Sequence, residues 1–267
     1  MKEKIINIVA NSSYESRKIK QKLIKLLKDN GYTPSKNFNP DAELNVCIGG
    51  DGTFINAVHK NNFTKIPTVG INTGHLGFYQ EVSPDKLEKF IEDYNNGDYS
   101  IEELKLVEAE IFTRNKSLIL SGVNEIVLKA KHSKIIHTNV YVNRNFLEKF
   151  SGDGLLISTP SGSTAYNFSC NGSLVHHSLE VMQMTPIAPI NSVVYRSLTS
   201  PIIIPGSYTI SLVPEKRYAN SNLLLVDGKE YFFNNLKKIN LKLSNRKINK
   251  LVFSQDSYWE NLRDKFL

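Results

Sequence analysis

The first hundred residues of this 267-residue chain alternate between short apolar runs and stretches with helical spacing. Ile5 to Ala10 and Leu44 to Ile48 are apolar runs of strand length, and Ile19 and Leu23 between them lie one helical turn apart. Repeated strand–helix units of this kind predict a parallel sheet that is covered by helices on both faces. The alternation therefore restricts residues 1–98 to a Rossmann-like α/β domain.

The pattern changes after about Tyr99. Stretches of alternating polar and apolar residues follow, such as Leu106 to Phe112 and Thr138 to Val142, and turn residues separate them. This pattern predicts an all-β, β-sandwich-like domain over residues 99–252. Residues 253–267 return to helical spacing, and we expect this helix to pack back on the N-terminal domain.

Composition restricts the class of protein and its partners. No apolar run approaches the ~20 residues that cross a bilayer, so no membrane partner is expected. The apolar segment at the N-terminus is too short for a signal peptide, so a cytoplasmic location is expected. In that compartment Cys47 and Cys170 are expected to be reduced thiols. The net charge of +7 comes from scattered basic residues without an aromatic-plus-basic motif, so no nucleic-acid partner is expected either.

The segment Gly49-Gly50-Asp51-Gly52-Thr53 follows a buried strand and precedes a predicted helix. Its glycines let the backbone approach phosphate oxygens, and the free N–H groups of the helix would face the anion. The alternative for Asp51 is a helix N-cap, and Thr53 could either cap the helix or bind a phosphate. The loop lacks the lysine of the Walker motif, so positive charge must come from Mg²⁺ and backbone dipoles.

Two further segments offer polar groups at strand ends. Asn72 to Phe78 follows the next strand, so this loop and the Asp51 loop are expected to share one crevice, with Phe78 either stacking on a base or packing in the core. Asn124 and Glu125 open a later strand, and their amide and carboxylate suit ribose hydroxyls or an adenine amino group. An ordinary polar turn is the alternative that this pair alone would favour.

The segment from Gly152 to Asn167 is the most informative. Asp153 lies between two glycines and leads into an apolar strand, which is followed by a hydroxyl-rich loop containing Gly162 and Tyr166. Hydroxyl donors, close backbone approach and a ring for stacking suit a nucleotide. A Ser/Gly linker would look similar, but linkers rarely follow a buried strand or carry tyrosine. His and Cys residues show no zinc-ligand spacing, so no protein-held metal site is expected.

Taken in this order, these segments resemble the NAD kinases, particularly the bacterial ones. The match extends from Val46 to about Pro205 and continues at Asp227-Gly228. Lipid kinases share the first glycine motif, whereas the string from Thr159 to Tyr166 is the specific part. The resemblance implies transfer of a phosphoryl group from ATP, or from polyphosphate, to the 2′-hydroxyl of the adenosine ribose of NAD. It also implies Mg²⁺ or another divalent cation, and a homodimer or homotetramer.

The resemblance further implies roles for individual residues. Asp51 would be the catalytic base, with Gly49, Gly50 and Thr53 in the phosphate loop. Asn124 and Glu125 would hold the adenosine part of NAD, and Asp153 and Ala188 would meet the nicotinamide end. The full expected set of NAD- and nucleotide-binding residues is Gly52, Phe78, Asn124, Glu125, Lys149, Ser151, Asp153, Thr164, Ala165, Tyr166, Ser169, Ala188 and Asp227.

Two positions depart from the family pattern. Ser151 stands where close Gram-positive relatives often have arginine. Lys149 lies on the same face of the predicted strand and could replace part of that charge, though not the forked geometry of arginine. Gly228 follows Asp227, which removes a possible side-chain contact. Both departures bear on NAD affinity and donor preference, and neither touches the expected chemistry.

Two other functions agree less well with the sequence than an NAD kinase. A lipid or other small-alcohol kinase would need an apolar acceptor pocket, whereas the segment from Thr159 to Tyr166 is polar. A catalytically silent nucleotide-binding regulator would have no need of the base at Asp51. The sequence therefore favours the enzyme.

Overall fold

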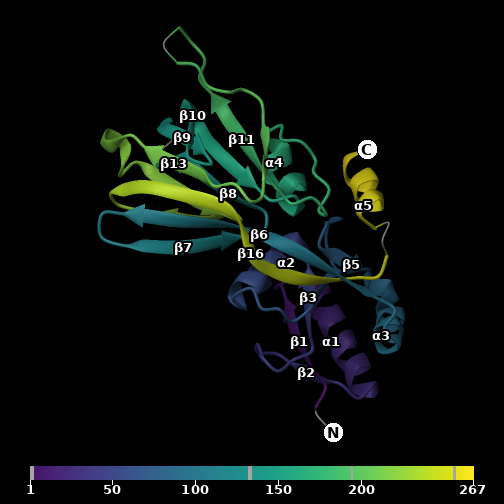
Figure 1. The fold of residues 1–267 in the computed structure, drawn as a ribbon. Coiled ribbons are helices and arrows are strands. Elements are labelled where there is room, and N and C mark those ends of the chain that lie inside the picture. Colours follow the sequence, from purple (N-terminus) through teal and green to yellow (C-terminus); the bar gives the residue numbers. More distant parts are fainter. Residues whose placement is uncertain (1–2, 132–133, 194, 255–256) are drawn as a thin grey trace. The chain divides into compact units, whose positions relative to one another are not determined.

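The computed structural model describes residues 3–131, 134–193, 195–254 and 257–267 (Figure 1). The chain divides into two compact units: unit 1 comprises residues 1–104 and 247–267, and unit 2 comprises residues 105–246. The sequence-based domain boundaries at 98/99 and 252/253 stay predictions. Within the described residues, no helix combines the length and apolarity that a membrane span requires.

Unit 1 is built on a parallel sheet in the order β4-β3-β1-β2. Strand β5 and the end of β16 also pair in parallel with β4. The strands are β1 (Ile5–Ala10), β2 (Thr33–Ser35), β3 (Leu44–Gly49), β4 (Thr68–Asn72), β5 (Gln80–Val82) and β16 (Leu236–Val252). The helices are α1 (Tyr14–Asp29), α2 (Asp51–Lys60), the 3₁₀ turn η1 (Pro84–Lys86), α3 (Leu87–Asn96) and α5 (Ser257–Phe266).

Strand β3 shows why this sheet forms. Each of its six residues is buried, as expected for a parallel strand that is covered on both faces. Alternate residues of the strand, such as Val46 and Ile48, pack in one core with Leu23 of α1 and Phe90 of α3. The strand ends at Gly49, directly before α2, so the sheet delivers the glycine loop to its carboxyl edge.

Unit 2 is mostly β and its strands pair antiparallel, in the main order β15-β14-β8-β10-β9-β13-β16. Strand β11 pairs with β10 and β12, and β6 pairs with β16 and β7. The strands are β6 (Ser100–Thr113), β7 (Ser117–Gly122), β8 (Glu125–Ala130), β9 (Ile136–Val142), β10 (Asn145–Ser158), β11 (Val181–Pro189), β12 (Ile202–Pro205), β13 (Ile210–Pro214), β14 (Asn222–Val226) and β15 (Lys229–Phe232). The short helices are η3 (Ser161–Thr164), α4 (Tyr166–Ser169) and η4 (Lys216–Tyr218).

The core of unit 2 draws residues from most of these strands. Phe150, Leu155 and Ile157 of β10 pack with Met184 of β11 and Leu128 of β8. This alternation of inward apolar side chains is what the sequence pattern predicted. The expected fold class, α/β in the N-terminal part and all-β in the C-terminal part, is therefore confirmed.

Candidate functional site

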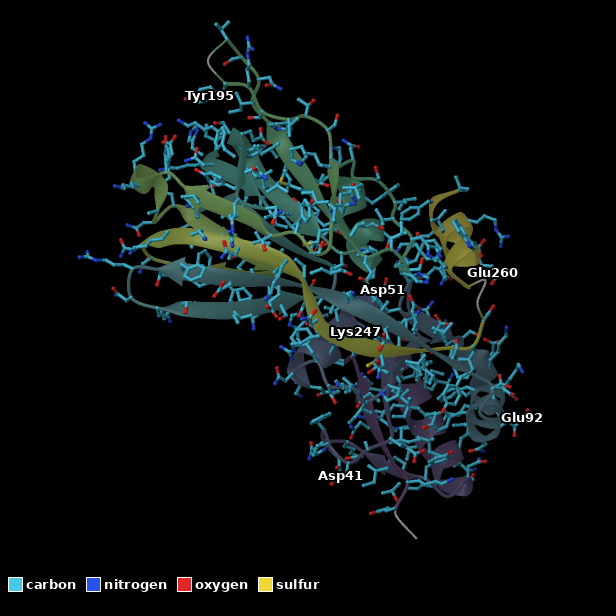
Figure 2. The ribbon with its side chains drawn as sticks, viewed as in Figure 1. Asp41, Asp51, Glu92, Tyr195, Lys247 and Glu260 are labelled. Carbon is cyan, nitrogen blue, oxygen red and sulfur yellow. The ribbon has the colours of Figure 1, made fainter. Side chains whose placement is uncertain are left out.

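In unit 1, two loops leave neighbouring parallel strands at the same edge of the sheet. Gly49 of β3 pairs with Asn72 of β4, and the N–H of Thr73 donates to the carbonyl of Gly49 at 3.3 Å. Asp51 (Figure 2) is the first residue of α2, and Gly50 is its N-cap, without a side-chain capping bond. The alternative interpretation of Asp51 as the N-cap is therefore wrong.

The Asp51 carboxylate points to the second loop instead. Its Oδ2 accepts the backbone N–H of Phe78 and its Oδ1 that of Tyr79, both at 3.0 Å. A Cβ atom on Gly77 would lie 2.1 Å from Oδ1, so glycine is needed for this approach. Each carboxylate oxygen keeps a lone pair that can accept a further donor. The fold thus presents a fixed acceptor at the positive end of α2.

Helix α5 contributes side chains to the same place in unit 1. The Phe78 ring lies 5.9 Å from the ring of Phe266 and 6.2 Å from that of Tyr258. The Lys265 ammonium lies 4.9 Å from the centroid of the Phe78 ring and 3.9 Å from Asp51 Oδ2. Sequence reasoning gave no role to Lys265, because nothing in a local pattern links it to a loop almost two hundred positions earlier.

In unit 2, Asp227 holds the segment that carries Asn124 and Glu125. Its carboxylate accepts backbone N–H groups from Val123 at 2.7 Å, Asn124 at 2.8 Å and Glu125 at 3.2 Å. Asp227 and Gly228 have φ values of 48° and 81°, the left-handed pair typical of a tight hairpin between strands such as β14 and β15. The turn geometry therefore aims the carboxylate at the Asn124 segment.

Thr159 and Gly162 fix the same segment through its carbonyl groups. The Thr159 hydroxyl donates to the carbonyl of Val123 at 2.7 Å, and the Thr159 N–H donates to that of Asn124 at 2.9 Å. A Cβ on Gly162 would lie 2.0 Å from the Asn124 carbonyl oxygen. The hydroxyls of Thr159 and Ser163 are thus engaged with backbone, which sequence reasoning did not foresee when it assigned this loop's hydroxyls to a ligand.

Glu125 is a buried acid next to the short helices. Its exposed fraction is 6%, and its Oε2 has no hydrogen-bond partner among the described residues. Burial, and then the nearby negative charge of Asp227, raise the pKa of Glu125 to about 8, although the backbone N–H of Tyr166 opposes the shift. At neutral pH the carboxyl group is therefore mostly protonated and can donate as well as accept a hydrogen bond.

The structure brings several of the expected site residues together. Asn124, Glu125, Tyr166 and Asp227 form one group, with Thr164 buried, Ala165 half-buried and Ser169 exposed beside Tyr166 in the chain. Asp153 and Ala188 form another, because Gly152 pairs with Pro189 and Gly154 with Ile187, which leaves these two residues opposite each other. Both are exposed.

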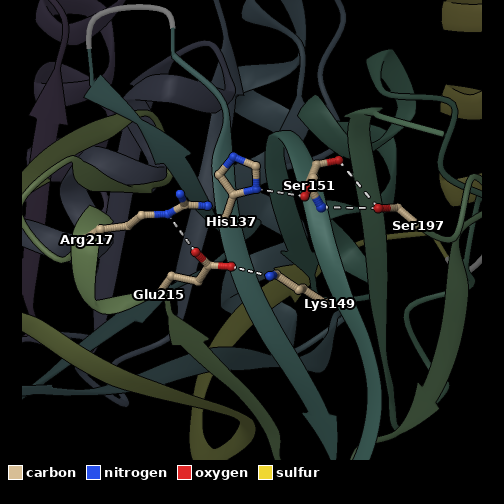
Figure 3. A network of polar contacts seen from close by, with 6 residues as sticks. All are labelled: His137, Lys149, Ser151, Ser197, Glu215 and Arg217. Atoms are coloured by element: carbon tan, nitrogen blue, oxygen red, sulfur yellow. Dashed lines mark hydrogen bonds and ion pairs between the residues drawn. The ribbon is translucent and has the colours of Figure 1, made fainter. Parts of the chain in front are cut away.

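Lys149 and Ser151 lie in a polar network on β10 (Figure 3). Ser151 is fully buried, with its Oγ 2.8 Å from His137 Nδ1, and its N–H donates to Ser197 Oγ at 3.1 Å. The Lys149 ammonium lies 2.5 Å from Glu215, and the hydrogen bond from Lys149 is the largest cause of the lowered pKa of Glu215.

This network bears on the expectation that Lys149 replaces part of the charge of the arginine that relatives have at position 151. The charge of Lys149 is matched locally by Glu215, and the space beside Ser151 is filled by His137. Burial lowers the pKa of His137, so its ring is mostly neutral at pH 7. No motif in the sequence pointed to His137 or Ser197.

Comparison with protein families gives two matches that together span most of the chain. Residues 2–99 match the ATP-NAD kinase N-terminal domain, and residues 123–252 match the ATP-NAD kinase C-terminal domain.

Curated relatives are similar over nearly the whole length. An NAD kinase of Finegoldia magna is 44% identical over 99% of this chain and 98% of its own. An NAD kinase of Streptococcus thermophilus is 34% identical over 98% of this chain and 94% of its own.

Solved structures share the fold. Yeast NADH kinase complexed with NADH superposes with a TM-score of 0.86 at 20% identity, over 98% of this chain and 87% of its own. An NAD kinase from Archaeoglobus fulgidus in complex with ATP superposes with a TM-score of 0.77 at 22% identity, over 97% of this chain and 98% of its own.

Proposed function

Because the chain belongs to the NAD kinase family and phosphorylates NAD to NADP with ATP, we propose that Asp51 is the group that orients and deprotonates the acceptor hydroxyl. The acceptor is the 2′-hydroxyl of the adenosine ribose of NAD. The observation that carries the proposal is the Asp51 carboxylate, which two backbone N–H groups hold at the start of α2, directly after the glycine loop.

The geometry of Asp51 suits a late proton transfer. An aspartate carboxylate is a weak base beside an alcohol, so the hydroxyl keeps its proton until bonding to phosphorus has begun. In the loose transition state of phosphoryl transfer the attacking oxygen is barely bonded, and the proton leaves late. A carboxylate held by two N–H groups cannot swing away, so it keeps the hydroxyl in line and then accepts its proton.

The phosphate loop Gly49-Gly50-Asp51-Gly52-Thr53 receives the donor phosphates in this proposal. A divalent cation, Mg²⁺ or another, would neutralise charge on the phosphates. No group of three or more His, Cys, Asp or Glu residues suited to a metal occurs among the described residues. A site with a single protein carboxylate is compatible with Mg²⁺, because Mg²⁺ usually takes most of its ligands from substrate phosphates and water and only one or two carboxylates from the protein. Asp51, the acidic residue of the phosphate loop, would be the protein's carboxylate ligand.

Unit 2 binds NAD in this proposal. Asn124 and Glu125 take the adenosine ribose, because their backbone is fixed by Asp227 and Thr159 and the Glu125 carboxyl is buried with one oxygen available. The remaining proposed contacts of unit 2 follow the family pattern: Thr164, Ala165, Tyr166 and Ser169 for adenine, Asp153 and Ala188 for the nicotinamide end, and Lys149, Ser151 and Asp227 nearby. Of these, Asp227 acts through the Asn124 segment that it holds, whereas Lys149 pairs with Glu215 and Ser151 contacts His137. The family pattern also gives Phe78 of unit 1 a nucleotide-binding role.

The proposed setting is a homodimer or homotetramer in the cytoplasm. NAD and ATP, the two small-molecule substrates, are cytoplasmic metabolites. Cys47 and Cys170 are free thiols, and burial raises the pKa of Cys47 to about 12, so that this thiol is unreactive.

One assay tests the proposed function. The purified protein is incubated with NAD, ATP and Mg²⁺, and the product is identified by mass and by an NADP-specific dehydrogenase. NADP is the expected product, and excess EDTA is expected to abolish its formation. Polyphosphate replaces ATP in a parallel reaction to compare donors. If no NADP forms with ATP and none forms with polyphosphate, the proposal is overturned.

A further inference from the structure

The phosphate loop of unit 1 carries no basic side chain. Residues 49–53 contain neither lysine nor arginine, although negative charge lies on the phosphoryl group throughout its transfer. Kinases with other phosphate loops place a lysine or an arginine there. A cation from elsewhere in the chain would meet this need.

Lys265 occupies the position that such a cation requires. Its ammonium lies 3.9 Å from Asp51 Oδ2, and the two side chains are about one-third exposed, so water screens their charges only in part. The distance exceeds that of a hydrogen bond, which is at most about 3.2 Å for N–H···O. The ammonium is thus near the carboxylate without being bonded to it.

Aromatic contacts hold Lys265 beside Phe78, in the loop that follows β4. Phe266 and Tyr258 of α5 lie against the ring of Phe78, and the Lys265 ammonium lies over the same ring at 4.9 Å from its centroid. A cation over an aromatic face is attracted by the ring's quadrupole. The last turn of α5 is therefore fixed beside Phe78, whose backbone N–H donates to Asp51 of the phosphate loop, while the long lysine stem can still change direction.

We propose that Lys265 is a phosphate-binding residue, whose ammonium turns from Asp51 to a phosphate oxygen of the donor when ATP binds. The proposal rests on the proposed function of the Asp51 loop. Turning breaks no hydrogen bond to Asp51, because the carboxylate keeps the N–H groups of Phe78 and Tyr79. The same movement takes the ammonium away from the carboxylate that would accept the hydroxyl proton.

Two substitutions test the charge of Lys265. Lys265→Met keeps an apolar stem over Phe78 and removes the ammonium, whereas Lys265→Arg keeps a cation. Arg263→Ala is the matched control, because Arg263 lies on the same helix, is exposed, and pairs with its neighbour Asp264 at 2.8 Å. For each variant kcat and KM are measured for ATP and for NAD, ATP binding is measured by calorimetry, and folding is checked by melting temperature.

Lys265→Met is expected to lower kcat/KM for ATP and the affinity for ATP by about tenfold or more, the effect of losing one charge-assisted hydrogen bond. In Lys265→Met the KM for NAD is expected to stay within about twofold of the wild-type value. Lys265→Arg is expected to recover most of the lost ATP affinity, and Arg263→Ala is expected to match the wild type. ATP kinetics unchanged in Lys265→Met would overturn the proposal. Equal losses in all three variants would also do so, because they would indicate helix docking rather than charge. These outcomes are distinguishable from failure of the proposed function, because in that case the wild-type protein itself would form no NADP.

Discussion

The carboxylate of Asp227 accepts the backbone N–H of Asn124 at 2.8 Å, and the Asp227 N–H donates to the carbonyl of Glu125 at 3.1 Å. A hairpin turn therefore fixes a segment that lies about a hundred positions earlier in the chain. The carboxylate also accepts two further N–H groups, so one anion organises the segment proposed to hold the NAD ribose.

Replacing Asp227 with asparagine keeps the size of the side chain at position 227 but should disturb the segment that carries Asn124. The amide nitrogen of asparagine would face a backbone N–H that the carboxylate now accepts. Leaving one such buried donor without a partner costs about 1–3 kcal/mol, so the free energy of unfolding in urea should fall by that amount. KM for NAD should rise severalfold, while KM for ATP changes little.

Glu230→Gln is the matched control for Asp227, because Glu230 lies on the same hairpin and is exposed. It should leave both stability and KM unchanged. An Asp227→Asn variant with wild-type stability and wild-type KM for NAD would show that the three hydrogen bonds do not position the site.

The buried acid Glu125 should make stability depend on pH. Its pKa of about 8 in the folded state lies above its ordinary value of 4.5, so between these values the folded protein holds a proton that the unfolded chain has lost. Stability is therefore greatest below about pH 4.5 for this group and falls as the pH rises towards 8, by at most about 1.4 kcal/mol per pH unit.

Glu125→Gln should remove this contribution, because glutamine stays neutral at every pH. The free energy of unfolding in urea is measured for both proteins at about pH 5.5, 6.5 and 7.5. The difference between the two pH dependences isolates Glu125, because the contributions of the other titrating groups are the same in both proteins. Parallel curves for wild type and variant would mean that Glu125 is ionised in the folded protein at neutral pH.

Replacing Asp51 with asparagine tests the proposed base. Asparagine keeps the size of the side chain but cannot take a proton, and its amide nitrogen would face one of the two N–H groups that the carboxylate now accepts. General-base contributions are typically ~10²–10⁴-fold, so kcat should fall by at least about that factor. NAD affinity should change far less, because the proposed NAD contacts of unit 2 remain. Asp41→Asn, an exposed aspartate of unit 1, is the control. A folded variant that binds NAD and turns over at more than about a tenth of the wild-type rate would exclude Asp51 as the base.

Ser151→Arg should destabilise the protein rather than improve NAD binding. Ser151 is fully buried against His137 and Ser197, so an arginine would overpack the site, at a cost of about 1–3 kcal/mol. Ser151→Ala separates size from hydrogen bonding, since it removes only the oxygen that contacts His137 Nδ1. Melting temperature and KM for NAD are measured for both. An arginine variant with normal stability and a lower KM would mean that position 151 opens to the ligand.

Local sequence determined the elements and the loops between them. Helix α3 ends at Gly97 with a φ of 79°, because glycine adopts the left-handed conformation without a Cβ clash. The apolar runs of β1 and β3 became buried parallel strands, and the Asp51 loop followed β3 as predicted. The order of the motifs was specific enough to identify the family, and the comparisons confirm it.

Only the tertiary structure decided which side chains meet. Asp51 and Phe78 are joined because β3 and β4 are neighbours in the sheet, and Asp227 reaches Asn124 because β14 pairs with β8. Burial set the pKa of Glu125, and His137 took the space beside Ser151. Hydrogen bonds, desolvation and packing depend on distances between residues far apart in the chain, and a sequence pattern carries only local spacing and side-chain type.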